Sequence, residues 1–290
     1  MMKKLLAFIL AVLTLFTLLV SCGGDEVGSQ TGSEESSTQG EESATQGLEF
    51  TLLDDGTYSV GIGSATGEEI VIPSSYNGKS VTKIAKRGFE ELENLKKITI
   101  PDTIKVIGDY AFSGCSSLKK PTLPPSIEEI GAYAFLECRS ISNLVLPNGI
   151  KTIGEGAFYN CRYLVVITLP SGITEIKDNT FNGCTTLTRI VIPDGVKTIG
   201  ESAFDGCSFL ASVTLPSGLI SIGKKAFSGG RTLKSITLPD TLTSIGDEAF
   251  SICLELESIT VPKSVVSMGE NVFLDCPKLT EIIYESEMTR

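Results

Sequence analysis

The strongest constraint on how this chain can fold is a period of 23 residues. Nine phenylalanines follow one another at that interval: Phe89, Phe112, Phe135, Phe158, Phe181, Phe204, Phe227, Phe250 and Phe273. A proline recurs with the same period from Pro101 to Pro262, and a leucine or isoleucine recurs from Leu95 to Leu279. One unit of this size cannot bury its own apolar face, so successive units must stack. The period therefore predicts a solenoid with one continuous core.

Each unit contains a strand, a bend, a second short extended piece and a compact turn. In the segment LASVTLP, Leu210, Val213 and Leu215 alternate with polar residues, which is the periodicity of a strand. Pro216 ends that strand because proline has no N–H to donate. The segment GLISIG that follows predicts the second extended piece, closed by a glycine. The polar segment around Ala-Phe, as in ESAFDGC, predicts a single helical turn.

The repeated pattern L-x-x-I-x-L-P-x-x-I-x-x-I-G-x-x-A-F-x-x-C resembles the BspA-type leucine-rich repeat of bacterial surface proteins, over residues 84 to 284. The resemblance implies a right-handed β-α superhelix, rich in β structure, with a parallel concave sheet and short helical turns. Four departures are expected to make their repeats irregular. Pro121 replaces the apolar strand residue, Lys177 replaces the glycine, and Leu92 and Gly230 replace the cysteine.

The residues before the repeats predict export and a lipid anchor. Lys3 and Lys4 precede an apolar run, Leu5 to Val20, which is too short for a membrane span and is typical of a signal peptide. The run ends in Leu-Val-Ser-Cys, which resembles the lipobox of bacterial lipoproteins. That resemblance implies cleavage after residue 21 and lipidation of Cys22. A plain secretory signal that happens to contain a cysteine is the alternative.

Composition predicts four parts of the chain. Residues 1–21 are expected to be the lipoprotein signal peptide and residues 22–47 a disordered tether, since the latter are polar and acidic with hardly any aliphatic side chains. Residues 48–83 are expected to hold an N-terminal capping hairpin around Asp54-Asp55-Gly56 and a first, irregular repeat. Residues 84–290 are expected to form the nine 23-residue repeats, ending in a C-terminal cap strand.

Several classes of chemistry are disfavoured. The chain has a net charge of −11, so nucleic acid is not expected as a partner. It contains no histidine, which removes the commonest general base and any histidine-ligated metal site. We therefore expect no enzyme, catalytic residue, metal or cofactor. Seven cysteines, from Cys115 to Cys276, share one repeat position, where a straight column of buried free thiols is expected rather than disulfides or a metal site.

Eight residues that depart from their repeat columns are the candidate ligand-binding residues. They are Tyr110, Tyr133, Tyr159, Tyr163, Phe209, Lys97, Lys120 and Arg189. Exposed aromatic side chains can anchor a partner, although they can equally cover neighbouring loops. The basic side chains lie on the predicted sheet and could orient an acidic protein or glycan, or they could simply be solvated.

Together these observations predict a cell-surface lipoprotein whose repeat domain binds a macromolecule, most plainly a protein of a host or neighbouring cell. The resemblance to BspA-type proteins implies adhesion. Localisation is then the outer surface of the bacterial envelope, with membrane contact only through the lipid on Cys22. A periplasmic scaffold that organises other envelope proteins is the alternative, and a glycan-binding or enzymatic module is a third reading.

Overall fold

The computed structural model of this chain describes residues 43–285, which belong to a unit that begins at Glu42. The predicted signal peptide, Cys22 and most of the predicted tether lie outside the described residues. The last tether residues are part of the folded unit. The Thr45 N–H donates to the Val71 carbonyl at 3.0 Å, and the Thr45 Oγ1 accepts from the Val71 N–H at 2.8 Å. Ordered structure therefore begins before residue 48.

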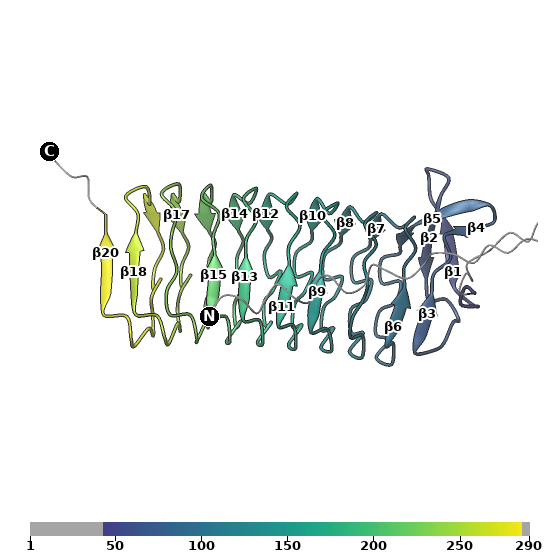
Figure 1. Cartoon of the computed structure of the whole chain (residues 1–290), viewed down its shortest axis with the longest axis horizontal. Helices are drawn as coiled ribbons and strands as arrows, with labels where there is room; N and C mark the ends of the chain where they lie inside the picture. The colour runs from purple at the N-terminus through teal and green to yellow at the C-terminus, as the bar shows by residue number, and fades with distance from the viewer. Residues whose placement is uncertain (1–42, 286–290) are drawn as a thin grey trace, which may run out of the picture. The chain divides into compact units, whose positions relative to one another are not determined.

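The unit is a coil whose turns build two columns of parallel strands, with most turns adding one strand to each column (Figure 1). We call the outward side of the first column the strand face. Its strands are β3 (Glu69–Val71), β6 (Lys97–Thr99), β9 (Asn143–Val145), β11 (Val166–Thr168), β13 (Arg189–Val191), β15 (Ser212–Thr214), β18 (Ser258–Val261) and β20 (Glu281–Tyr284).

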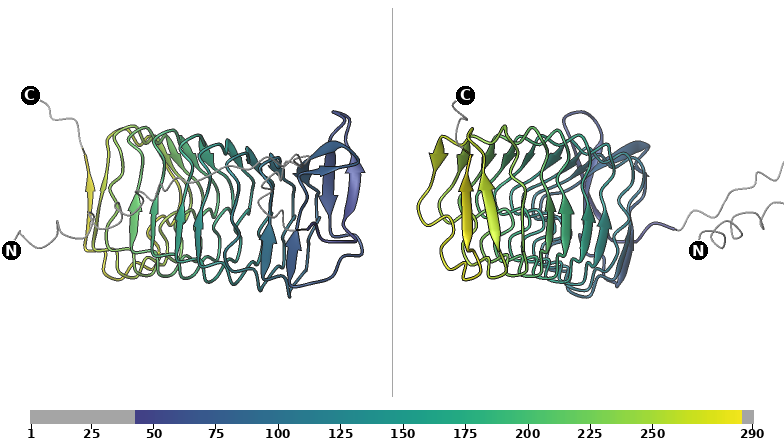
Figure 2. Two further views of the ribbon diagram at one scale, coloured as in Figure 1. Left: turned by 45° about the vertical axis from the view of Figure 1, so that its right-hand side comes forward. Right: turned by 60° about the vertical axis from the view of Figure 1, so that its left-hand side comes forward.

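The second column consists of two-residue strands on a different side of the coil (Figure 2). They are β7 (Val106–Ile107), β8 (Glu129–Ile130), β10 (Thr152–Ile153), β12 (Glu175–Ile176), β14 (Thr198–Ile199), β16 (Ser221–Ile222), β17 (Ser244–Ile245) and β19 (Ser267–Met268). Partners in both columns are one repeat apart, as Thr198 is from Ser221 and Arg189 is from Ser212. The predicted solenoid with parallel strands is confirmed.

The N-terminal end has a different topology. Its strands are β1 (Glu49–Leu52), β2 (Tyr58–Gly61), β4 (Ser75–Tyr76) and β5 (Lys79–Ile84). β1 and β2 pair as an antiparallel hairpin, and β2 then pairs with β5, which leads into the second column. β4 and β5 form a second hairpin that projects from this end (Figure 1).

The core is a single cluster that runs through the coil, because the inward side chains of each turn pack on those of the next. The phenylalanine column is its centre. Successive rings from Phe89 to Phe273 have centroids 5.2–6.0 Å apart and planes within 20° of one another. All of these rings except Phe273 are at most 1% exposed.

The predicted helical turn is wrong: residues 43–285 contain no helix, and so none that could cross a membrane. In the turn after β14, Ser202 and Gly206 have positive φ angles of 51° and 70°, which an α-helix does not allow. Alternate N–H groups also point to the next turn of the coil. Phe204 donates to the Ala226 carbonyl at 2.8 Å. These turns therefore extend the ladder on a third side, and the superhelix is built of β structure and turns.

The thiol column is confirmed. Six of the seven cysteines are buried, Cys276 is partly exposed, and all seven are free. Each thiol also donates to a backbone carbonyl of the preceding turn of the coil. For example, the Cys161 Sγ lies 3.1 Å from the Phe135 oxygen. The Phe135 carbonyl also accepts the backbone N–H of Cys138 at 3.1 Å, so the cysteines fill space and add a second hydrogen bond to carbonyl groups that their own turns already use.

Both strand columns are interrupted where the repeat is broken. The strand ladder stops between β6 and β9, at the turn of the coil that contains Pro121, and again between β15 and β18, after Gly230. The second column stops between β10 and β12, where Lys177 stands in place of glycine. At a regular position such as Gly200, a Cβ atom would lie 2.6 Å from the Asp178 amide nitrogen. A side chain at residue 177 therefore prevents the close approach that the ladder needs.

Candidate functional site

The structure divides the eight candidate residues among three places. Arg189 lies in the middle of the strand face, and Tyr163 and Phe209 lie just before two of its strands. Lys97 and Lys120 lie at the N-terminal interruption of the same face. Tyr110, Tyr133 and Tyr159 belong to the turns on the third side of the coil, where they form a separate stack.

The middle of the strand face carries exposed aliphatic side chains. Val145 on β9 is 72% exposed and Val191 on β13 is 64% exposed. They occupy a column that otherwise holds mainly threonine, because outward positions of a strand favour β-branched residues. Arg189 lies two residues before Val191 on the same side of β13, and together with Val166 and Pro193 it lines a hollow of about 400 Å³. The face can therefore offer apolar contact area around one guanidinium group.

Tyr163 and Phe209 extend this region. They stand three residues before β11 and β15, at equivalent positions separated by one intervening repeat, and they are 63% and 59% exposed. Parallel strands are about 4.8 Å apart, so the two positions are separated by roughly 10 Å along the coil. Neither ring makes an aromatic contact within the described residues. Both are free to contact a partner.

The tyrosine stack is largely occupied with itself. The Tyr110 and Tyr133 rings stack with centroids 5.2 Å apart, and Tyr159 follows at 6.4 Å. The Arg87 guanidinium covers the other face of Tyr110 at 5.0 Å. The Tyr133 hydroxyl donates to the Glu155 carboxylate at 2.6 Å, and this hydrogen bond raises the pKa of Tyr133. Since the ring faces cover each other, this group presents ring edges rather than open stacking surfaces.

A glycine makes room for this stack. Gly156 follows Tyr110 and Tyr133 in the same column, and all three have φ angles near +55°. A Cβ atom at Gly156 would overlap the Tyr133 ring, so that ring lies directly over the glycine. Only glycine allows both the left-handed backbone and the ring above it.

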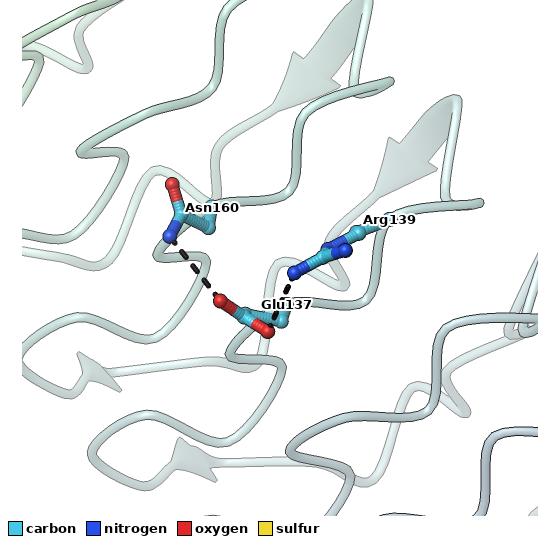
Figure 3. A network of polar contacts seen from close by, with 3 residues as sticks. All are labelled: Glu137, Arg139 and Asn160. Carbon is cyan, nitrogen blue, oxygen red and sulfur yellow. Dashed lines mark hydrogen bonds and ion pairs between the residues drawn. The ribbon is translucent and has the colours of Figure 1, made fainter.

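A polar network borders the stack (Figure 3). Glu137 accepts hydrogen bonds from Arg139 at 2.9 Å and from the Asn160 side-chain amide at 3.4 Å. The Glu137 N–H donates to the carbonyl of Tyr159 at 2.8 Å. The two charges neutralise each other, so this network fixes the turn and does not attract a charged ligand.

The N-terminal interruption of the strand face forms a groove of about 660 Å³, which we call the lysine groove. Four lysines line it: Lys96, Lys97, Lys119 and Lys120. Its apolar lining includes Ile98, Ile100 and Leu123. Asp102 also lines it, so the groove carries four lysines and one carboxylate over an aliphatic floor, on a chain whose net charge is −11.

The seven described thiols form one column, and six of them are buried. Within residues 43–285, no group of three or more Cys, Asp or Glu side chains could hold a metal ion. Burial raises the pKa of Cys115 and Cys161 to about 12, so both stay protonated at neutral pH.

The stacked coils and the sheet of exposed side chains define the leucine-rich repeat class of solenoids. Residues 82–211 and 197–290 match the family model described as the BspA type leucine rich repeat region. The chain belongs to this family, whose repeats form scaffolds for protein interaction.

Two solved structures are similar over most of the chain. A leucine-rich repeat protein from Bacteroides ovatus is 28% identical with a TM-score of 0.70, and the match covers 85% of this chain and 72% of that one. The leucine-rich repeat protein of T. pallidum is 27% identical with a TM-score of 0.53, and the match covers 82% and 91% of the two chains. No curated protein matches the sequence.

The sequence analysis missed two features of the strand face. Val145 and Val191 were not among the candidate residues, although valine within a threonine column is a visible signal of apolar exposure. It also treated Pro121 only as an irregularity. The groove beside Pro121 follows from the loss of a ladder strand, which a residue pattern does not display.

Proposed function

We propose that this protein is an exported lipoprotein, anchored to the bacterial envelope through Cys22, whose repeat domain binds a protein partner at the cell surface. The observation that carries the proposal is the strand face, where Val145 and Val191 are 72% and 64% exposed on two strands that flank β11, and Arg189 lines the same hollow as Val191. Exposed apolar side chains close to an arginine are typical of protein-binding surfaces. Adhesion to a host or neighbouring cell is the role that this surface best fits.

Other features support a binding role over catalysis. The family consists of repeat scaffolds, and the whole sequence contains no histidine. The strand face also carries the aromatic rings of Tyr163 and Phe209 at its border, which would supply contact area at low cost in conformational entropy. The segment before residue 22 supports export, and Cys22 would tie the protein to the membrane by its lipid alone.

The anchor is tested with Cys22→Ser. In the parent strain, the wild-type chain should incorporate a labelled fatty acid and remain with the membranes. The variant should incorporate none and appear in the soluble fraction. Incorporation of label into the variant would show that Cys22 is not the lipidated residue.

The display and the binding surface are tested separately. Protease added to intact cells should remove the repeat domain; protection from the protease would place it inside the envelope, as a scaffold for other envelope proteins. For binding, Val145→Glu with Val191→Glu should abolish capture of the partner that wild-type protein retains. Thr260→Glu, an exposed residue of the same column on β18, is the matched control and should leave capture unchanged.

A further inference from the structure

The lysine groove differs from the rest of the strand face because its ladder is open. At a regular turn of the coil, the Val165 N–H donates to the Ser142 carbonyl at 2.8 Å, and the Thr188 N–H donates to Val165 at 3.2 Å. At the turn that contains Pro121, the equivalent bonds are missing. The N–H groups of Lys119, Lys120, Thr122 and Leu123 donate to no acceptor in the part of the chain that the structure describes.

Proline explains this opening. Pro121 cannot donate a ladder bond, and it also restricts the backbone of Lys120 before it. Pro124 is the proline that the repeats from Pro101 to Pro262 carry at this position, so Pro121 is the feature that sets this turn apart. The segment from Lys119 to Leu123 consequently forms no strand between β6 and β9, and its remaining N–H groups are left for another acceptor.

Two of the four lysines in the groove are neutralised within the protein and two are not. Lys96 forms an ion pair with Glu68 at 2.6 Å, and Lys97 lies 3.9 Å from Glu69. Lys119 and Lys120 are exposed and form no ion pair with any described residue. The free positive charge is thus next to the open N–H groups, and both kinds of donor suit carboxylate and carbonyl oxygens.

We propose that the lysine groove binds an acidic, extended peptide segment of the partner protein. Carboxylates of the segment pair with Lys119 and Lys120, its backbone or side-chain oxygens accept the open N–H groups, and an aliphatic side chain lies on Ile98, Ile100 and Leu123. This inference rests on the proposed protein-binding function and adds the chemical class of the segment that is bound. Because the whole chain is acidic, attraction is local to the groove.

The protein contains its own comparison site. The second interruption of the strand ladder, between β15 and β18, forms a hollow of about 540 Å³. Its lining includes Asp240, which is equivalent to Asp102 of the lysine groove, but it includes no lysine. An open ladder alone therefore does not supply positive charge, and acidic peptides should select the Pro121 groove over this one.

The test measures fluorescence polarisation of a labelled Glu-Leu-Glu-Glu-Leu-Glu peptide with the full chain in a mild detergent. Wild type should bind this peptide and bind the Gln-Leu-Gln-Gln-Leu-Gln peptide more weakly. Lys119→Glu with Lys120→Glu should weaken binding by about tenfold or more. The control, Lys224→Glu with Lys263→Glu, changes two exposed lysines outside the groove by the same charge and should bind like wild type.

Three results would overturn the proposal. The first is no binding of the acidic peptide up to millimolar concentration. The second is that Lys119→Glu with Lys120→Glu binds the peptide as tightly as wild type does. The third is tighter binding of heparin than of the peptide at the lysine groove, which would make the groove a polysaccharide site. If the groove variant still captures the protein partner while the strand-face variant Val145→Glu with Val191→Glu does not, the peptide site is wrong and the proposed function stands. Melting curves of both lysine variants verify that they fold.

Discussion

The Phe158 and Phe181 rings lie parallel, with centroids 5.5 Å apart and planes only 3° from each other. Each belongs to a different turn of the coil, 23 residues apart, and both are fully buried. This contact is repeated along the whole phenylalanine column, so one residue position per repeat holds successive turns together. The 23-residue period of the sequence therefore directly reflects how the core is packed, with one ring from each turn.

Replacing one ring in the middle of this column should cost much of the stability of the coil. We expect Phe158→Ala to lower the free energy of unfolding by about 3–5 kcal/mol, because neighbouring turns cannot close the cavity. Urea denaturation monitored by circular dichroism measures the loss. The control is Phe209→Ala, which removes an exposed ring and should change stability by less than about 0.5 kcal/mol. An unchanged denaturation midpoint for Phe158→Ala would contradict the assignment of the core.

Substitution in the glycine column that contains Gly200 should also lower the stability of the fold, but for a different reason. A Cβ atom at Gly200 would lie 2.6 Å from the Asp178 nitrogen, so Gly200→Ala must push two turns of the coil apart. We expect a loss of about 1–3 kcal/mol. The matched control is Gly218→Ala, whose Cβ would meet mainly the mobile end of the Lys197 side chain. Equal denaturation midpoints for the two variants would show that the close approach is unimportant.

Thiol reactivity should distinguish the end of the cysteine column from its interior. Cys276 is partly exposed and its contact with the Cys253 thiol lowers its pKa, whereas burial raises the pKa of Cys184. In the Cys22→Ser chain at neutral pH, a maleimide should modify Cys276 first, and the interior thiols only after unfolding. Mass spectrometry of the labelled peptides identifies the site. Rapid labelling of Cys184 in the folded protein would mean that the column is accessible.

Alkaline pH should destabilise the fold through the same column. An unfolded thiol ionises near pH 9, while folded Cys115 and Cys161 ionise only near pH 12. Between these values the unfolded chain has lost protons that the folded chain keeps, so stability is full below pH 9 and falls as the pH rises. Each such thiol should contribute a loss of about 1.4 kcal/mol per pH unit. Denaturation series at pH 8 to 11 measure how steeply the free energy of unfolding falls with pH. This slope should be shallower for Cys115→Ala with Cys161→Ala than for wild type. Identical slopes would exclude these two thiols as the cause.

The two aromatic groups should behave differently when removed. Tyr110→Ala with Tyr133→Ala removes a stacked pair and a hydrogen bond to Glu155, and should lower stability by about 1–3 kcal/mol. Tyr163→Ser with Phe209→Ser removes exposed rings and should leave stability unchanged but weaken capture of the partner. Thermal melting and partner capture, measured on both variants, separate the roles. A partner lost only with Tyr110 and Tyr133 would move the binding surface to the turns.

Much of the fold could be predicted from the residues because a 23-residue period constrains every turn of the coil alike. The buried phenylalanines and the thiol column follow from that regularity. The helical turn could not be predicted correctly. Short polar segments around Ala-Phe suit one helical turn locally, but the neighbouring turn of the coil lies close enough to accept alternate N–H groups, as Ala226 does from Phe204. Hydrogen-bond acceptors in the neighbouring repeat therefore determine the backbone conformation of these turns.

In the candidate site, too, some features follow from the sequence and others only from the tertiary structure. The sequence by itself determined the coil, its core columns and the repeats that break the pattern, because these depend on side-chain size and polarity at fixed intervals. Only the tertiary structure decided what the breaks do. Pro121 opens a groove beside Lys119 and Lys120, and the half-buried Tyr133 ring packs over Gly156. Those outcomes depend on the roughly 4.8 Å spacing between turns of the coil, which brings together groups that are 23 residues apart in the chain.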